Sequence, residues 1–297
     1  MPTVTMPSVA HQTAPRTTSD ETSPAVQALL RDIAIPPRPT ALVNLKRELA
    51  SDEPDIGRLV EIVVSDVAMS AALIKLVNSP WLGLRRRVGT VQESLQILGL
   101  KRCELVLTEI ALRKALPTEG LSLERFWDVS SKRSQAMGLL APRIGLEAAT
   151  AQTMGLFADV GIPVLAQRFA QPSYLDTLRT ANISEDAFTV VEQSRHGTDH
   201  TVIGSLVARS WGVSTEVSQA VRLHHDYDIF GDAVPPQVQE LVALCLIAEH
   251  IIQRFEGQNP HGEWTKGGAH SMKLLSLSDE ELDMWTDELH ERFNLDD

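Results

Sequence analysis

The sequence predicts an all-α protein, and three observations carry this prediction. Apolar residues recur at three- and four-residue spacing through most of the chain, which is the period of a helix. No alternating apolar and polar run longer than about four residues occurs, so strands are expected to be scarce or absent. Aromatic residues make up only 5% of the chain against 43% hydrophobic residues in total, a balance that favours helices packed on helices.

The first helices are expected to follow a polar tail. Residues 1–22 are rich in Pro, Thr and Ser and show no apolar period, which predicts a disordered tail. Ser23-Pro24 has the residue types of a helix start, and apolar residues between Asp66 and Asn78 form one helical stripe. The pattern Thr90–Glu93 predicts a capping box that opens a short helix ended by Gly99. A longer helix is expected from about Lys101 to Leu116.

A boundary between two lobes is expected at Pro117–Ser122, which contains Pro and Gly. It divides an N-terminal helical lobe, residues 23–117, from a C-terminal lobe, residues 118–256. Apolar periodicity predicts long helices in the second lobe at 123–143, 148–169, 184–195, 200–210, 214–226 and 236–256. The remaining residues, 257–297, are expected to be a loop and a last helix. Phe255–Gly268 has the composition of a loop, and Ser278–Glu281 is a capping-box pattern.

Charge and cysteine content exclude several classes of protein. The chain has 27 Lys and Arg against 39 Asp and Glu, a net charge of −12, which repels nucleic acid and anionic lipid. Cys103 and Cys245 lie far apart in apolar stretches and are expected to be buried thiols in a reducing compartment. No run of about 18 apolar residues and no signal-peptide pattern occurs. We therefore expect a cytoplasmic protein that binds neither membrane nor nucleic acid.

Acids and histidines in the second half are the first candidate site. Asp159 lies in the nearly apolar stretch GLFADVG, where a carboxylate needs a donor or a cation, and Glu249 is a second acid on an apolar helix. With His200, His224 and His225 they have the residue types of a mixed nitrogen and oxygen site for zinc, iron or manganese. Alternatively, the five form hydrogen bonds in a helical core, with a histidine as the donor to Asp159.

The loop after the helix that ends at Asn78 is the second candidate site. Pro80 stops that helix, and a large apolar side chain and three cations follow on an acidic chain. Tryptophan beside arginine is a pairing enriched at interface hot spots. The candidates for binding a protein partner are Asn78, Ser79, Trp81, Arg85, Arg86 and Arg87. Alternatively, Trp81 plugs the seam between the lobes and the arginines pair with local acids.

The order of these motifs resembles the HDOD domain, the regulatory relative of the HD-domain metal phosphohydrolases. The resemblance covers about 33–255. It rests on IPPRP at 35–39, the helix ending at Asn78-Ser79, VGTVQESLQILGLKR, Phe126-Trp127, GLFADVG, HGTDHTVIGSLVARSW and His224-His225. It implies an N-terminal helical bundle followed by a degenerate lobe similar to the HD hydrolase core.

The resemblance also implies that hydrolase chemistry has been lost. Val129 and Ala158 stand where the hydrolases have two histidine ligands, and neither side chain offers a lone pair. A late aspartate of the hydrolases falls near Glu249. We therefore expect no catalysis, no bound metal or other cofactor, and no need of metal for folding.

The function implied is bacterial signal transduction through contacts with protein partners. Two alternatives remain. One is a cryptic HD-type metal phosphohydrolase or phosphodiesterase that uses Asp159, His200, His224 and Glu249. The other is a nucleotide-binding sensor that has kept the cleft and lost catalysis.

Overall fold

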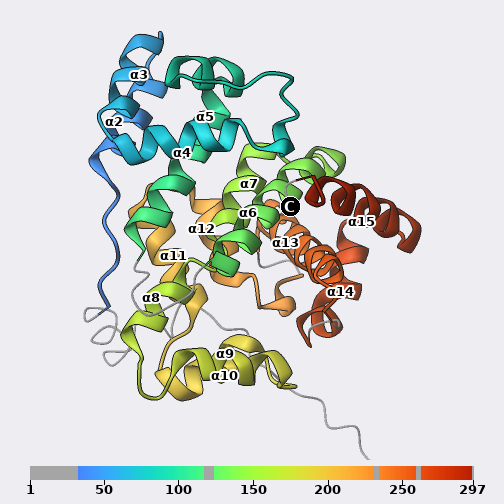
Figure 1. Cartoon of the computed structure of the whole chain (residues 1–297). Helices are drawn as coiled ribbons and strands as arrows, with labels where there is room; N and C mark the ends of the chain where they lie inside the picture. The colour runs from blue at the N-terminus through green and yellow to red at the C-terminus, as the bar shows by residue number, and fades with distance from the viewer. Residues whose placement is uncertain (1–32, 117–123, 231–233, 259–261, 296–297) are drawn as a thin grey trace, which may run out of the picture. The chain divides into compact units, whose positions relative to one another are not determined.

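A computed structural model of the chain confirms the all-α fold (Figure 1). The structure describes residues 33–116, 124–230, 234–258 and 262–295, without the side chains of Trp81 and Lys101. Within these ranges every regular element is a helix. The predicted tail, the helix start at Ser23-Pro24 and the lobe boundary at Pro117–Ser122 lie outside the described residues and stay predictions.

The helices between residues 40 and 115 pack together as a bundle. They are α2 (Thr40–Leu49), α3 (Ile56–Val64), α4 (Val67–Val77), the 3-10 turn η2 (Pro80–Leu82) and α5 (Val91–Ala115). As predicted, Thr90 caps α5 by accepting a hydrogen bond from the amide of Glu93 at 3.1 Å. Gly99 interrupts α5 with a φ of 71°, which separates the short helix from the longer one. This bundle has its own buried leucines at the helix contacts, Leu45, Leu59, Leu73, Leu107 and Leu112.

The second group of helices includes α13, whose residues are buried along most of its length. Its elements are α6 (Glu124–Leu140), η3 (Ala141–Ile144), α7 (Ala148–Phe157), α8 (Gly161–Arg168), α9 (Tyr174–Ile183), α10 (Phe188–His196), α11 (His200–Ser210), α12 (Thr215–Leu223), η4 (Tyr227–Ile229), α13 (Pro236–Phe255), α14 (Gly262–Leu274) and α15 (Asp279–Phe293). Helices α6, α12, α14 and α15 all contact α13, and α8 packs on α11.

Three helix predictions in the second group need correction. The helix expected at 148–169 is two helices, because the chain turns at Ala158–Val160. Helix α9 was not predicted at all. The loop expected at Phe255–Gly268 is wrong, since α14 begins at Gly262. Its Gly267 is a packing residue, because a Cβ there would lie 2.6 Å from the ring of Tyr227. By contrast, the capping box at Ser278 and the helix behind it are confirmed.

Residues 33–39 tie the start of the described chain to the second group of helices. The indole Nε1 of Trp211 donates a hydrogen bond to the carbonyl of Pro36 at 2.9 Å. In return, Arg38 Nη1 donates to the carbonyl of Trp211, also at 2.9 Å. Trp211 is almost fully buried, so this exchange of hydrogen bonds fixes the extended segment against the C-terminal end of α11.

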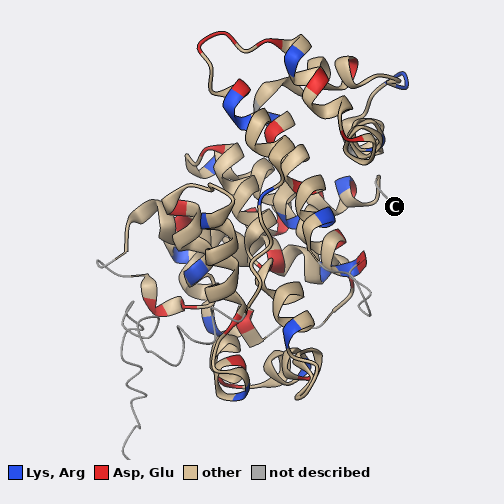
Figure 2. Cartoon of the chain, turned by 90° about the vertical axis from the view of Figure 1, so that its left-hand side faces the viewer, with Lys and Arg blue, Asp and Glu red and all other residues tan. Residues whose placement is uncertain are grey.

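One helical stretch among the described residues, Ala148–Arg168, is long and apolar enough to cross a membrane. However, 61% of its most apolar 18-residue window is buried inside the protein, which is typical of a core helix, and the turn between α7 and α8 interrupts the stretch. Acidic and basic residues are both spread over the helices (Figure 2). Cys103 and Cys245 are buried free thiols, as predicted.

Candidate functional site

Asp159 lies in the turn between α7 and α8, directed towards the start of α11. Gly161 makes this approach possible, because a Cβ at that position would lie 2.1 Å from the carbonyl oxygen of His200. Any larger residue would push the two helices apart. The glycine therefore brings the carboxylate of Asp159 beside the imidazole of His200.

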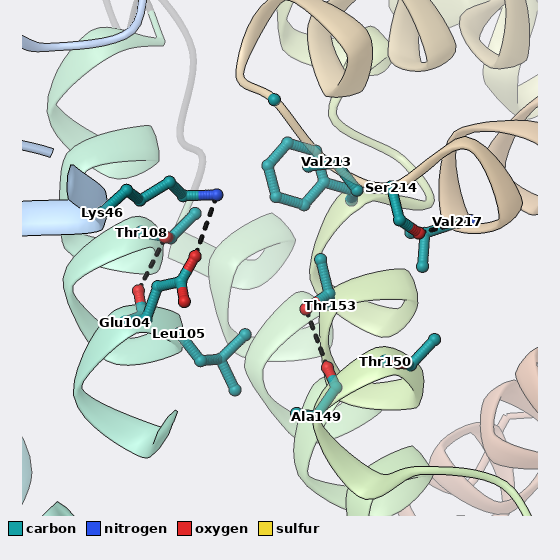
Figure 3. Close-up of a pocket in the computed structure, with 12 residues that line it drawn as sticks. Lys46, Glu104, Leu105, Thr108, Ala149, Thr150, Thr153, Val213, Ser214 and Val217 are labelled. Carbon is teal, nitrogen blue, oxygen red and sulfur yellow. Dashed lines mark hydrogen bonds and ion pairs between the residues drawn. The ribbon is translucent and has the colours of Figure 1, made fainter. Parts of the chain in front are cut away.

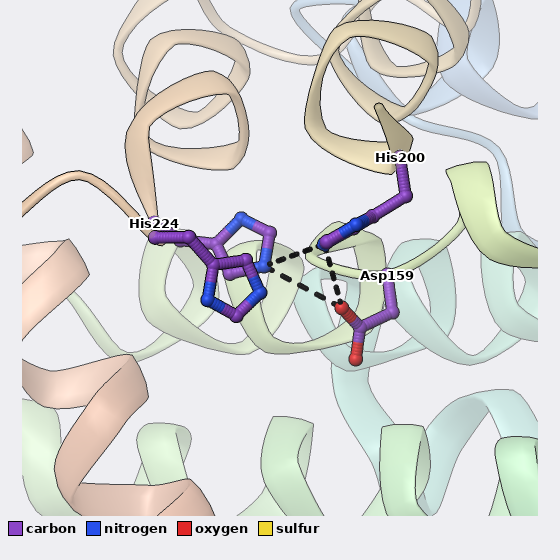
Figure 4. A group of neighbouring side chains, drawn as sticks. Asp159, His200 and His224 are labelled. Atoms are coloured by element: carbon purple, nitrogen blue, oxygen red, sulfur yellow. Dashed lines mark hydrogen bonds and ion pairs between the residues drawn. The ribbon is translucent and has the colours of Figure 1, made fainter. Parts of the chain in front are cut away.

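Asp159, His200 and His224 form a triangle of polar atoms (Figure 4). His200 Nε2 lies 3.3 Å from His224 Nε2. Asp159 Oδ1 lies 3.5 Å from His200 Nε2 and 3.4 Å from His224 Nε2. His200 is the first residue of α11, which Asp199 caps, and His224 ends α12. The two histidines are fully buried while Asp159 is partly exposed.

Arg133 on α6 is the main partner of Asp159, which corrects the expectation of a histidine donor. Its Nη1 donates to Asp159 Oδ2 at 2.6 Å and to Glu249 Oε1 at 2.8 Å. Its Nε donates to the carbonyl of Gly155 at 2.9 Å. At Gly155 a Cβ would lie 2.8 Å from the backbone of Ser134, so the glycine lets α6 approach α7 closely. The same nitrogen of Arg133 therefore links the carboxylates of Asp159 and Glu249.

Opposing effects set the charges of this cluster. Burial alone would raise the pKa of Asp159, but the cation of Arg133 holds that pKa well below its ordinary value. Burial would lower the pKa of His200, but the carboxylate of Glu192 raises it to about 9. Burial and the neighbouring His225 lower the pKa of His224 to about 4. At neutral pH, His200 therefore carries a second proton and His224 does not.

Each imidazole of the cluster has a partner for its Nδ1 atom. His200 Nδ1 faces Glu192 Oε2 at 2.7 Å, and Glu192 also accepts a hydrogen bond from the hydroxyl of Tyr174. His224 Nδ1 faces the carbonyl of Val221 at 2.8 Å. His225 Nδ1 faces Glu263 Oε2 at 2.8 Å. These partners orient all three rings.

A cavity of about 170 Å³ opens onto the cluster. Its lining includes Asp159, Arg133, Glu249 and His225, and also Val129. The structure therefore brings all five predicted polar residues to one region, with Val129 at its edge. Ala158 is fully buried beside Asp159.

Arg133, Glu192 and Glu263 were not predicted as members of the site. The signal for Arg133 was available, because it shares the buried face of α6 with Ser130, Met137 and Leu140. A charged residue on such a face needs a partner. Glu192 is likewise a charged residue on the buried face of its helix, α10. Glu263, by contrast, lies in a glycine-rich segment whose composition predicts a loop.

The second candidate site, the loop after α4, is closed by Asn78. The Asn78 amide donates to the carbonyls of Ile74 and Val88 at 2.7 and 2.9 Å. It also accepts from the amide of Val88 at 2.8 Å. Arg85 and Arg87 are exposed, and Arg86 pairs with Glu93 at 3.1 Å.

Ser79 lines a mainly apolar cavity of about 100 Å³ next to that loop. Leucines from η2, α4 and α5 form one side of this cavity, Leu76, Leu82, Leu98 and Leu105. The side chain of Trp81 lies outside the described residues, so its role as a plug or an anchor stays a prediction.

A further pocket of about 210 Å³ lies among α2, α5, α7 and the start of α12 (Figure 3). Its polar groups already have partners within the protein. Lys46 pairs with Glu104 at 3.0 Å, and Thr108 and Thr153 donate to carbonyls of their own helices at 2.7 and 2.8 Å. Nothing in this lining favours a nucleotide over another small molecule.

Comparison with known proteins gives both a family and a fold. The model of the HDOD domain matches residues 35–227. An uncharacterised protein of Treponema pallidum (strain Nichols) is 23% identical over 230 residues, which are 76% of this chain and 44% of that protein. The chain therefore spans less than half the length of this relative.

Solved structures share the fold at low identity. A Shewanella amazonensis SB2B protein whose name proposes a phosphohydrolase has a TM-score of 0.69 at 21% identity, over 90% of this chain and 96% of its own. A Marinobacter aquaeolei VT8 protein whose name proposes signal transduction has the same TM-score and identity, over 90% of this chain and 59% of its own. An HDOD domain protein of unknown function from Geobacter sulfurreducens has a TM-score of 0.65 at 21% identity, over 90% of this chain and 95% of its own.

The sequence motifs, the all-α architecture and the match over 35–227 agree with one another. The chain belongs to the HDOD family.

Proposed function

We propose that this chain is a regulatory protein of bacterial signal transduction that acts by binding a partner protein and does not hydrolyse phosphate esters. The position of Arg133 is the observation that supports the absence of phosphate-ester hydrolysis. Its guanidinium lies between the carboxylates of Asp159 and Glu249, within 2.6 and 2.8 Å. Two-metal hydrolysis needs an ion in contact with such carboxylates to activate water and hold the phosphate.

The residues around this pair support the same proposal. Val129 lines the cavity and Ala158 is buried next to Asp159, and neither offers a lone pair to a metal ion. Among the structural neighbours, one name proposes a signal transduction protein and another a phosphohydrolase. Because both carboxylates already pair with Arg133, we favour the former role for this chain.

The partner surface proposed is the loop 79–87 with the adjacent apolar cavity. Arg85 and Arg87 form no ion pair with another described side chain, and three successive cations are unusual on a chain of net charge −12. The cavity beside Ser79 would accept one apolar side chain. The partner that fits is a protein with an acidic surface around an exposed apolar residue, since opposite charges guide the encounter and burial of the apolar side chain gives affinity.

A capture experiment tests this surface. The tagged full chain with Arg85, Arg86 and Arg87 all changed to Glu should lose its specific partner and keep the unfolding midpoint of the wild type. The matched control carries the same changes at three exposed arginines elsewhere, Arg125→Glu, Arg179→Glu and Arg254→Glu. Equal loss in both variants would mean that net charge alone matters and would remove the loop from the proposal.

A separate assay tests the absence of hydrolysis. Purified chain supplied with Mn²⁺ should give no turnover of a generic phosphodiester above that of Asp159→Asn. Metal-dependent turnover that disappears in Asp159→Asn would establish the cryptic hydrolase instead.

A further inference from the structure

The apolar cavity beside Ser79 adjoins a second cavity of about 380 Å³. Three side chains line both cavities, Arg102 on α5, Gln135 on α6 and Gln152 on α7. The far part of the second cavity is lined by the start of α7 and by Arg292 on α15. The two cavities therefore form one groove, with leucines at one end and charged side chains at the other, which we call the glutamine groove.

Gln135 offers this groove a hydrogen-bond acceptor. Its side-chain oxygen is buried and accepts no hydrogen bond from any described residue. A buried acceptor without a donor is destabilising, so this position favours a ligand that brings an N–H or O–H group. Beside it, a Cβ at Gly138 would lie 2.3 Å from the side chain of Gln152. The glycine therefore lets Gln152 lie against α6 and line the same groove.

Arg102 gives the groove a cation that a ligand can pair with. It is exposed and forms no ion pair with another described side chain. The two acids of the lining are already bound within the protein, because Glu109 accepts from Arg113 and Glu147 accepts from Thr150, both at 2.8 Å. The first amides of α7 add a partial positive charge, since the N-cap residue of this helix forms no capping hydrogen bond. The charged end of the groove therefore favours an anionic group.

We propose that the glutamine groove binds an extended segment of the partner protein in which an apolar residue lies within two positions of an acidic one. The apolar side chain enters the cavity beside Ser79, a backbone N–H donates to Gln135, and the carboxylate pairs with Arg102. An extended peptide presents these three groups in sequence, whereas a free fatty acid lacks the N–H donor. The inference rests on the proposed function, because it takes the apolar cavity as part of the partner surface.

The groove is continuous with the loop proposed to meet the partner. Ser79 and Leu82 belong to the loop 79–87 and also line the groove. An acidic partner attracted by the cations of that loop would bring its acidic segment to Arg102 as well, since complementary charge guides the encounter and fixes the register.

A random heptapeptide library displayed on phage, selected on the immobilised full chain, tests the groove without a cellular partner. We expect enrichment of Leu, Ile, Met or Phe within two positions of Asp or Glu. Selection on Arg102→Glu should replace those acids with Lys or Arg, because the charge that the groove accepts is reversed. The matched control is Arg179→Glu, which makes the same charge change at an exposed site on α9 and should give the wild-type pattern.

The enriched peptide is then synthesised, and its affinity is measured by fluorescence polarisation. Arg102→Ala should weaken binding about tenfold, the effect of one lost hydrogen bond between charged groups. Gln135→Leu should also weaken binding, while its unfolding midpoint stays at or above that of the wild type, since the buried acceptor without a donor is gone. A lower midpoint with unchanged affinity would show that Gln135 is only structural and would overturn its role.

No enriched pattern, or a pattern that Arg102→Glu leaves unchanged, would overturn the proposal. Displacement of the peptide by millimolar octanoate would assign the groove to free acids and would overturn it too. These outcomes are separate from the capture experiment. If the groove fails while reversal of the three loop arginines abolishes capture, the partner binds the loop alone and the proposed function stands. Failure of both would remove this partner surface altogether.

Discussion

Arg133 and Asp159 form a buried ion pair in which the guanidinium binds one oxygen of the carboxylate and leaves the other to two imidazoles. Arg133 Nη1 lies 2.6 Å from Asp159 Oδ2, while Asp159 Oδ1 faces His200 and His224 at 3.5 and 3.4 Å. The carboxylate therefore links a permanent cation on α6 to the histidines of α11 and α12. Asp159 is thus the residue that contacts Arg133, His200 and His224 at once.

Removal of the cation should destabilise the protein strongly. In Arg133→Met, Asp159 and Glu249 would face each other in the interior without a neutralising charge. Breaking a buried pair in this way costs about 3–5 kcal/mol of unfolding free energy, measured by denaturant titration. The control is Arg143→Met, which removes the half-exposed pair with Glu288 and should cost about 0–1 kcal/mol. Equal effects of the two substitutions would contradict the central role of Arg133.

Removal of the carboxylate should be milder and should depend on what replaces it. Measured in the presence of a chelator, Asp159→Ala should lower the unfolding free energy by about 1–3 kcal/mol, because Arg133 and the histidines lose a shared acceptor. Asp159→Asn should cost less, since its amide oxygen can still accept from Arg133. If both variants unfold at the midpoint of the wild type, the carboxylate does not contribute to the free energy of unfolding.

Most helices could be predicted from the sequence because their signals are local. The apolar stripe ending at Asn78, the cap at Thr90 and the capping box at Ser278 each lie within a few residues of the helix they define. Helix α14 could not be predicted in this way. Its glycines indicate a loop locally, and only contact with Tyr227, far along the chain, shows that Gly267 is needed for packing.

The candidate site shows the same division between local and tertiary information. Asp159 was identifiable because an acid in an apolar stretch needs a partner, but its partner depends on the close approach of α6 to α7 at Gly155. The histidines were identifiable by type, whereas their orientation depends on Glu192 and Glu263. For Arg133 and Glu192 the signal in the sequence is a charge on a buried helix face.

His250 should make stability depend on pH below neutrality. Burial and the nearby Arg254 lower its pKa from 6.5 to about 4, so the folded chain keeps this ring neutral where the unfolded chain protonates it. The stability contribution is thus fully present above pH 6.5 and is lost as the pH falls towards 4, by about 1–3 kcal/mol. In denaturant titrations across this range, His250→Gln should lose less stability than the wild type. Parallel pH profiles would show that His250 is protonated without cost.

Asn78 should act on the loop that carries the arginines without touching a partner itself. Its amide closes that loop through Ile74 and Val88, at 2.7, 2.8 and 2.9 Å. Asn78→Ala leaves partly buried backbone groups without partners and should cost about 1–3 kcal/mol in thermal or chemical unfolding. The control is Asn44→Ala, because among the described residues Asn44 accepts only from the exposed Arg47, at 3.3 Å, and its loss should change stability little.

The two functional interpretations of this loop then separate. If loop 79–87 binds the partner, Asn78→Ala should weaken capture as well as stability, because the three arginines lose their fixed backbone, whereas their reversal to Glu should affect capture alone. If the loop contributes only to stability and does not bind the partner, Asn78→Ala should lower stability. Capture of the partner by the folded fraction should then stay at the wild-type level. That second pattern would move the search for the partner surface away from this loop, because a docking loop whose anchor is removed has to lose affinity along with its order.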